Sequence, residues 1–524
     1  MAGISTAMSK LQPGTHVPLV RPRFGDMLSI ELWIMISGHL LHLQSPDSHD
    51  LRSLRLVSWK LYHVSTPYYY RTFIVLPHHL VRRPSTLGKD VLSNVRKFSQ
   101  NIVVNQSTPT FPARLVEFMA ECPHLKSLEY RLYLTLNRSA NFPAEVALAD
   151  QMSHLRLHIN VRKSNPLGPP YGLYINFPTI THSNLVSLDL MSHVMERIRD
   201  SDMDQLRDLL VRSVKLRTLR IMGSRVFESW HPIHGRMPPL RDLFLARWST
   251  TAPRGLGHPI SQHSFWDLSK LSKLSSRSEI VFSTVPTFMG SFSSFFVAGL
   301  KSFEYSPSPR LGPLSPTEVE VKHHKRANQD ILQLIRDNGD IEELFVTCYF
   351  VSEIIPAITI TLGQTLRALR LRSPEFLDPD TSLEDVIALR SSCVVLIDLE
   401  ISITFPDRVE VAHYDPGHPT WTIICELSKI RSLQRLKLVA QSPSYSVDQS
   451  PQMQKAIIEI LRDDKIGAPL SQLSLLFPHC KKFHAKYESR LVEYTWDVLG
   501  EQTCKRSREL VKVDQYHMEY DDEV

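Results

Sequence analysis

The stretch "LRALRL", residues 366–371, has leucine at its first, fourth and sixth positions, and this spacing recurs along the chain. With conservative replacements, ten segments share it. They begin at Leu125, Leu185, Leu216, Leu240, Leu300, Ile341, Leu366, Leu396, Leu433 and Leu470. A unit that recurs in this way indicates a repeat architecture, in which neighbouring units stack and share one continuous core.

Amphipathic stretches precede several of these segments. "MDQLRDLLVRS" precedes Leu216, "QDILQLIRDN" precedes Ile341 and "MQKAIIEILRDD" precedes Leu470. Their apolar residues recur every three or four positions, which predicts helices with one apolar face. A repeated helix, turn and short strand predicts an α/β solenoid, with parallel strands on one wall and helices on the other. Successive segments begin 24 to 60 residues apart, so we expect an irregular array.

The alternation of side chains along a strand predicts which residues face away from the leucine core. The residue between the last two leucines of each segment lies on the opposite face, which would be an open wall. The substrate-facing candidates are Asp189, Arg220, Phe244, Phe345, Arg370, Glu400 and Lys437. The same rule adds Glu129, Glu304 and Ser474. This mixture of charges suits a surface that binds protein, and it suits plain solvation equally well.

A first apolar helix is expected near the N-terminus, in "LSIELWIMISGHLL", residues 28–41. Ser29 is placed to cap a helix that begins near Ile30. The apolar residues of this stretch fall on two arcs of the helix, so both sides must be covered.

A second helix is expected to start at Asp50, a good N-cap, and to carry one narrow apolar stripe. Pro67 should end it, since proline disfavours helical geometry in the residue before it. The stretch "YYYRTFIVL", residues 68–76, then predicts the first strand.

The order of residues over 26–76 resembles the F-box. That helical motif reads Leu-Pro-x-Glu-(Ile/Leu), an Ile a turn later, then Asp-Leu and Leu-Arg-Leu-Val-Ser-Lys, and fungal members often continue into Pro-x-x-Tyr-Arg-Thr. The matching residues are Leu28, Glu31, Leu32, Ile36, Asp50, Leu51, Leu54, Arg55, Leu56, Val57 and Ser58. The array that follows resembles the degenerate, RNI-like leucine-rich-repeat solenoids attached to F-boxes, of a kind common in fungi.

The resemblance implies the substrate-recognition subunit of an SCF-type cullin-RING E3 ubiquitin ligase, acting in ubiquitin-dependent degradation. The F-box would bind the Skp adaptor and, through it, the cullin-RING ligase, while the solenoid would bind an unknown target protein. The adaptor-binding residues that the resemblance implies are Leu28, Ile30, Leu32, Ile36, Leu51, Leu54, Arg55, Val57 and Ser58.

Two departures from the motif leave an alternative open. Ser29 stands where proline is usual, and Trp59 stands where a basic residue is usual. A non-ligase interaction scaffold, whose F-box-like hairpin serves only as a structural cap on the solenoid, would accommodate both, because repeat arrays need terminal caps.

We expect four regions in the chain. They are a disordered N-terminal segment at 1–24, the F-box at 25–77, the leucine-rich-repeat-like solenoid at 78–513 and an acidic tail at 514–524.

Charge and composition argue against several other classes. The chain has 60 basic and 54 acidic residues, a net charge of +6, so we expect neither a nucleic-acid nor a membrane partner. Its six cysteines form no CxxC pair, and no window reaches the roughly eighteen uninterrupted apolar residues of a membrane span. We therefore expect a cytoplasmic or nuclear protein.

Motifs for catalysis are absent from the sequence. The glycines form neither GxGxxG nor GxxxxGK(S/T), and no GxSxG or HExxH occurs. We therefore expect no catalytic residue, no cofactor and no metal site, and hence a protein that is not itself an enzyme.

Overall fold

The computed structural model places the described residues in two compact units. The first unit comprises residues 1–105 and 112–128, and the second comprises residues 106–111 and 129–524. The residues that the structure describes are 29–43, 53, 55–75, 89–106, 113–134, 140–141, 154–163, 175–176, 184–190, 200–222, 235–246, 267–278, 299–307, 318–348, 351–372, 381–403, 419–440, 451–483, 486–497 and 504–510.

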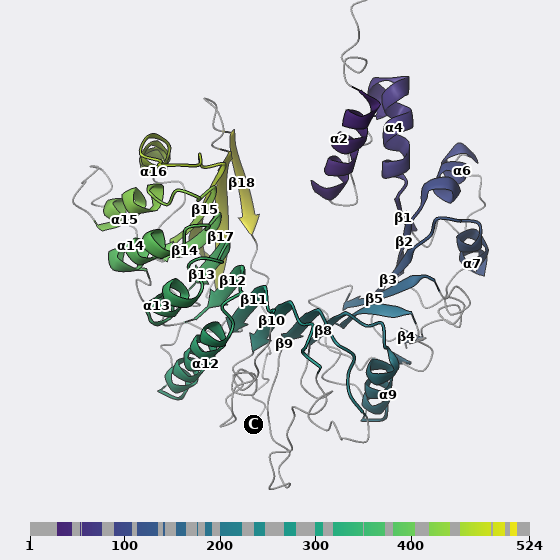
Figure 1. Ribbon diagram of the computed structural model, residues 1–524, viewed down its shortest axis with the longest axis horizontal. Helices are drawn as coiled ribbons and strands as arrows, with labels where there is room; N and C mark the ends of the chain where they lie inside the picture. Colours follow the sequence, from purple (N-terminus) through teal and green to yellow (C-terminus); the bar gives the residue numbers. More distant parts are fainter. Residues whose placement is uncertain are drawn as a thin grey trace, which may run out of the picture. The chain divides into compact units, whose positions relative to one another are not determined.

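The first unit combines a pair of helices with a pair of parallel strands (Figure 1). Its elements are α2 (Ile30–Leu43), α4 (Trp59–Tyr69), β1 (Thr72–Val75), α6 (Lys89–Phe98), β2 (Asn101–Gln106) and α7 (Ala113–Ala120). Strands β1 and β2 pair in parallel, from Thr72 with Asn101 to Val75 with Val104. Helix α6 lies in the connection between them, as a parallel pair requires. The strand predicted over 68–76 is present in part, as β1 over 72–75, because Tyr68 and Tyr69 belong to α4.

The second unit is a long sheet with helices in the connections between its strands. Its strands are β3 (Ser127–Leu134), β5 (Arg156–Lys163), β7 (Leu185–Leu190), β8 (Thr218–Met222), β9 (Asp242–Ala246), β10 (Lys273–Ser278), β11 (Ser302–Pro307), β12 (Glu343–Thr347), β13 (Ala368–Arg372), β14 (Asp398–Ile403), β15 (Arg435–Ala440), β16 (Gln472–Phe483), β17 (Lys486–Asp497) and β18 (Cys504–Leu510). Its helices are α9 (Asp200–Arg212), α12 (Glu318–Asp337), α13 (Val351–Thr361), α14 (Leu383–Ser392), α15 (Pro419–Ser428) and α16 (Pro451–Asp463). A separate small sheet pairs β4 (Ala140–Asn141) with β6 (Ile175–Asn176).

The strands of this sheet lie side by side in chain order and run parallel from β5 to β16. Figure 1 shows α12 to α16 together along one face of the neighbouring strands. The leucines of the repeat are buried, and Leu366, Leu369 and Leu371 are each 0% exposed. The predicted arrangement of parallel strands and helices around a leucine core is confirmed.

One backbone contact repeats from strand to strand. The carbonyl of Arg367 accepts hydrogen bonds from the N–H groups of both Ile397 and Asp398, at 2.8 and 3.0 Å. The carbonyl of Ser272 does the same for Lys301 and Ser302. Because this step recurs at the start of every strand from β9 to β16, it marks the structural repeat there independently of leucine spacing.

The structure adds repeats that the leucine pattern did not identify. Strand β10 begins within "LSKLSS", residues 271–276, where Ser276 takes the place of the third leucine. Strands β2 and β5 also lie outside the ten segments. The sheet ends in strands β16, β17 and β18, which pair antiparallel instead of continuing the parallel array.

The second N-terminal helix differs from its prediction. Helix α4 starts at Trp59, where the Ser58 hydroxyl accepts a hydrogen bond from the N–H of Leu61 at 3.2 Å, and it continues past Pro67 to Tyr69. The predicted end at Pro67 was therefore wrong. Proline is tolerated there because it lies in the last turn, so only one helical hydrogen bond is lost before the helix ends.

Candidate protein-interaction surfaces

The first candidate surface is the helical hairpin, which we define as α2, residues 55–57 and α4. Helices α2 and α4 pack against each other. The side chains of Trp33 and Ser37 on α2, and of Leu61 and Ser65 on α4, are buried. Over residues 30–37, where the structure describes the side chains of α2, the side that carries Trp33 and Ser37 is covered and the other side is exposed.

The start of α2 agrees with the sequence prediction. The hydroxyl of Ser29 accepts a hydrogen bond from the N–H of Leu32 at 3.3 Å, so serine acts as a helix cap at the position where the F-box motif usually has proline. Two hydrogen bonds lower the pKa of the Glu31 carboxyl. The larger effect comes from a backbone N–H, and the smaller one comes from the Ser29 side chain.

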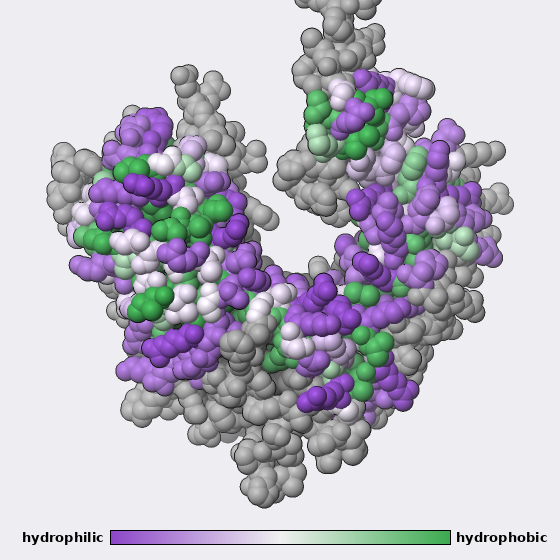
Figure 2. Space-filling model, in the orientation of Figure 1, coloured by the Kyte–Doolittle hydropathy of each residue, from purple (hydrophilic) through white to green (hydrophobic). Residues whose placement is uncertain are grey.

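Large apolar side chains remain exposed on this hairpin, and Figure 2 shows apolar residues gathered on its surface. Leu56 is 82% exposed and Trp59 is 79% exposed. The other exposed members are Ile30, Leu32, Ile34, Met35 and Val57. We call these seven residues the apolar patch. An apolar patch of neighbouring side chains on a small helical element is typical of a surface that binds another protein.

Three of the implied adaptor-binding residues belong to the apolar patch, namely Ile30, Leu32 and Val57. Ile36 is half-buried, and Ser58 is half-buried at the N-terminus of α4. Leu28, Leu51 and Leu54 lie outside the described residues, as do the regions 1–24 and 514–524. Of the patch members that were not among the candidates, Ile34 and Met35 could have been found from the two apolar arcs of residues 28–41, whereas Leu56 and Trp59 lie outside that stretch.

Arg55 lies against the tyrosines of α4. Its guanidinium carbon is 4.8, 4.5 and 4.9 Å from the ring centroids of Tyr62, Tyr69 and Tyr70. These are cation–π distances. Arg55 therefore ties residues 55–57 to α4 within the hairpin.

The second candidate surface is a row of side chains across the parallel sheet. The strand register pairs each member of the row with the next. The row consists of Asn160, Asp189, Arg220, Phe244, Ser275, Glu304, Phe345, Arg370, Glu400, Lys437 and Ser474. We call it the central row. All seven substrate-facing candidates lie in it, and Asn160 and Ser275 are the members that sequence reasoning missed.

Members of the central row differ in exposure. Arg370 is exposed, whereas Glu400 is 2% exposed and Phe244 is 8% exposed. Glu400 is covered because two arginines of the preceding strand are paired with its carboxylate.

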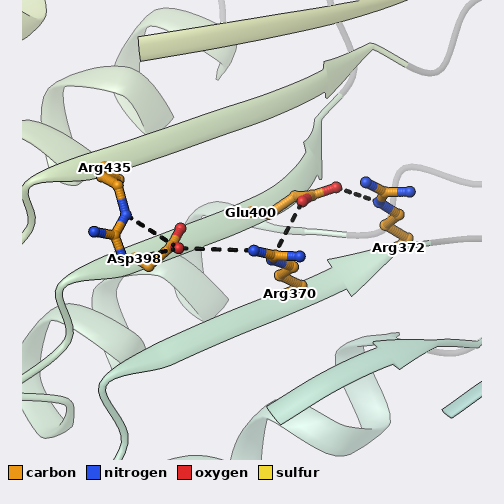
Figure 3. A network of polar contacts seen from close by, with 5 residues as sticks. All are labelled: Arg370, Arg372, Asp398, Glu400 and Arg435. Atoms are coloured by element: carbon orange, nitrogen blue, oxygen red, sulfur yellow. Dashed lines mark hydrogen bonds and ion pairs between the residues drawn. The ribbon is translucent and has the colours of Figure 1, made fainter. Parts of the chain in front are cut away.

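Five charged residues on three adjacent strands form the arginine cluster, shown in Figure 3. They are Arg370 and Arg372 on β13, Asp398 and Glu400 on β14, and Arg435 on β15. The carboxylate of Glu400 accepts a hydrogen bond from Arg372 Nε and lies 3.7 Å from Arg370 Nε. Asp398 Oδ2 accepts hydrogen bonds from both Nε and Nη2 of Arg435, each at 3.2 Å, and lies 3.8 Å from Arg370 Nη2.

The exposed part of this cluster is positively charged. The side chains of Arg370, Arg372 and Arg435 are 45%, 40% and 50% exposed, whereas those of Asp398 and Glu400 are 17% and 3% exposed. Three guanidinium groups and two carboxylates leave one net positive charge. The guanidinium carbon of Arg370 also lies 4.4 Å from the centroid of the Phe345 ring, which supports its plane.

Two buried cysteines, Cys122 and Cys393, have thiols that are poor nucleophiles at neutral pH. Burial raises the pKa of the Cys393 thiol to about 12, and burial followed by the charge of Glu121 raises that of Cys122 to about 11. Both thiols are protonated at neutral pH, and a thiolate is the reactive form. Within the described ranges, no group of three or more His, Cys, Asp or Glu side chains is placed to hold a metal ion. Among the helices that the structure describes, none is both long and apolar enough to cross a membrane.

One of the solved structures that this chain resembles is a distant neighbour. No family model matches the chain, and no curated protein matches it. A crystal structure of TLR13 in complex with ssRNA13 is 12% identical in sequence, with a TM-score of 0.28. The match covers 70% of this chain and 56% of that chain, so the chain spans little more than half of its length. The repeated strand step and the buried leucines themselves make the second unit leucine-rich-repeat-like.

Proposed function

We propose that this chain is the substrate-recognition subunit of an SCF-type cullin-RING ubiquitin ligase. The helical hairpin is the F-box and binds the Skp adaptor, and the strand face of the second unit, with the central row, binds a target protein. The motif order over residues 26–76 and the apolar patch on the same residues support this proposal.

The apolar patch is the observation that carries the proposal. Ile30, Leu32, Ile34 and Met35 follow one another closely on α2, and all are exposed. Burial of one such side chain contributes roughly 1.5–3 kcal/mol, so a patch of this kind favours association with a second apolar surface. The helices of an adaptor would supply that surface and would cover the side of α2 that α4 leaves open.

A subunit of this kind acts by proximity. It holds the target close to a ubiquitin-loaded conjugating enzyme, which raises the effective concentration of the target's lysines. It therefore needs two binding surfaces and contributes no catalytic residue of its own.

The test is co-expression of the full chain with the Skp adaptor, followed by size-exclusion chromatography. We expect the two proteins to elute together. The variant Leu32→Asp/Met35→Asp should elute without the adaptor, because it places two charges in an apolar interface. Both side chains are exposed in the chain alone, so this variant is expected to fold.

The matched control is Ile360→Asp. Ile360 is an apolar residue on α13 that is 86% exposed, so the substitution makes the same chemical change away from the hairpin. Co-elution should survive this change. A wild-type chain that elutes folded and without the adaptor would contradict the proposal and favour the alternative of a scaffold with an F-box-like cap.

A further inference from the structure

We propose that the arginine cluster is the site at which this protein binds an acidic peptide segment, rich in aspartate and glutamate, of a partner protein. The inference rests on the proposed function in one respect, which is that we take the partner protein to be the target of the ligase. The binding chemistry itself follows from the cluster.

The first argument is the fixed orientation of two guanidinium groups. Arg370 and Arg372 belong to the same strand, two residues apart, so their side chains lie on the same face of the sheet. Both contact the buried carboxylate of Glu400, and Arg370 also lies over the Phe345 ring. Groups held in this way lose little further freedom when a ligand binds, which favours affinity.

The second argument is the distribution of charge. The carboxylates of Asp398 and Glu400 are largely withdrawn from solvent, while all three guanidinium groups are between 40% and 50% exposed. A guanidinium carries five N–H donors, and the contacts with the two carboxylates use only some of them. The remaining donors face solvent and match the paired oxygens of a carboxylate.

The third argument concerns the size of the ligand. The cluster extends over β13, β14 and β15, and neighbouring strands are about 4.8 Å apart. Arg372 is paired with Glu400, Arg435 with Asp398 and Arg370 with both, so the three guanidinium groups are spread along two separate carboxylates. A segment with several acidic side chains matches this spacing better than one isolated anion.

The fourth argument favours carboxylate over phosphate. The cluster has only one net positive charge, and two of its five members are carboxylates. A phosphate monoester concentrates nearly two negative charges on one group at neutral pH, whereas an acidic segment distributes single charges among the three guanidinium groups.

The experiment measures the fluorescence anisotropy of a short labelled peptide of alternating glutamate and glycine, titrated with the purified full chain. We expect saturable binding that weakens as salt is added, since the contacts are exposed and ionic. The same peptide with glutamine in place of glutamate should not bind.

Variants locate the site. Arg370→Gln/Arg372→Gln should weaken binding at least about tenfold, because it removes charge-assisted hydrogen bonds. Arg462→Gln is the matched control, since this arginine is 55% exposed and paired with Asp463 on helix α16. It removes one positive charge outside the strands and should leave binding unchanged. Arg370→Lys/Arg372→Lys keeps both charges but loses the planar fork, so it should bind more weakly than wild type. It also provides a test if the glutamine variant does not fold.

Three results would overturn the inference. They are no binding of the glutamate peptide, equal binding by wild type and by folded cluster variants, and binding only of a phosphoserine peptide of the same length. If the wild-type chain binds the peptide but does not bind the Skp adaptor, this site is supported and the ligase assignment is contradicted, so the two proposals fail separately.

Discussion

Glu400 on β14 lies beneath Arg372 on β13, where its carboxylate accepts a hydrogen bond from the Arg372 Nε and is itself almost fully withdrawn from solvent. Their strands are adjacent, although 28 residues separate them in the chain. A buried carboxylate is stable only when it is paired, so this contact joins the stability of the sheet to the orientation of its exposed arginines.

Glu400→Gln should therefore destabilise the second unit. The substitution leaves Arg370 and Arg372 without their shared counter-charge, and we expect a loss of about 1–3 kcal/mol in the free energy of unfolding. Denaturant unfolding followed by circular dichroism measures this loss. The control is Glu342→Gln, because Glu342 is 38% exposed and pairs with the exposed side chains of Lys301 and Arg367. An equal effect of the two substitutions would contradict the special role of Glu400.

Gly467→Ala should be strongly destabilising. Gly467 has a φ of +87°, and a Cβ atom there would lie 2.5 Å from the carbonyl oxygen of Arg431, which also accepts a hydrogen bond from the N–H of Ala468. The left-handed conformation alone costs an L-residue about 1–2 kcal/mol. The control is Gly339→Ala, whose Cβ would have its nearest neighbours at 3.8 Å. The two melting temperatures should differ clearly, and similar values would refute the prediction.

His158→Gln should alter how stability depends on pH. Burial is the first cause that lowers the pKa of His158, the charge of Arg156 acts in the same direction, and the carboxylate of Glu129 opposes it. The unfolded chain therefore takes up a proton at a higher pH than the folded chain does. This contribution to stability is complete above the unfolded pKa of about 6.5 and is lost as the pH falls through that value toward the lower folded pKa.

Unfolding free energies between pH 5 and pH 8, a range of about three units around that pKa, measure this effect. The decline toward acid should be smaller in His158→Gln than in wild type. His154→Gln, at an exposed position two residues before the start of β5, provides the comparison. A wild-type decline that both variants reproduce would contradict the assignment to His158.

Arg55→Gln should loosen the helical hairpin. It removes the guanidinium that lies over Tyr62, Tyr69 and Tyr70, and each cation–π contact contributes about 0.5–1 kcal/mol at a partly exposed site. Hydrogen exchange of the amides in α4 should become faster. Arg212→Gln on α9, which removes an exposed arginine paired with Asp208, should leave the exchange of α4 unchanged. If the α4 amides of Arg55→Gln exchange at the wild-type rate, the prediction that Arg55 stabilises the helical hairpin is refuted.

The sequence by itself determined the repeat and the face on which each strand residue lies. In "LRALRL" the leucines at 366, 369 and 371 are buried and Arg370 is exposed, because alternation along a strand is a local property of the backbone. Where the pattern loses a leucine, as at Ser276 in β10, the strand was missed although its neighbours hold it in register.

The tertiary structure alone decided which of the outward-facing residues meet. Arg372 and Glu400 are 28 residues apart, and Arg435 and Asp398 are 37 apart, yet strand pairing places each pair in contact. The helices and connections between strands vary in length, so sequence distance carries no information about register. Register is set by hydrogen bonds between strands and by the packing of the leucines beneath them, and these determine that three arginines share two carboxylates.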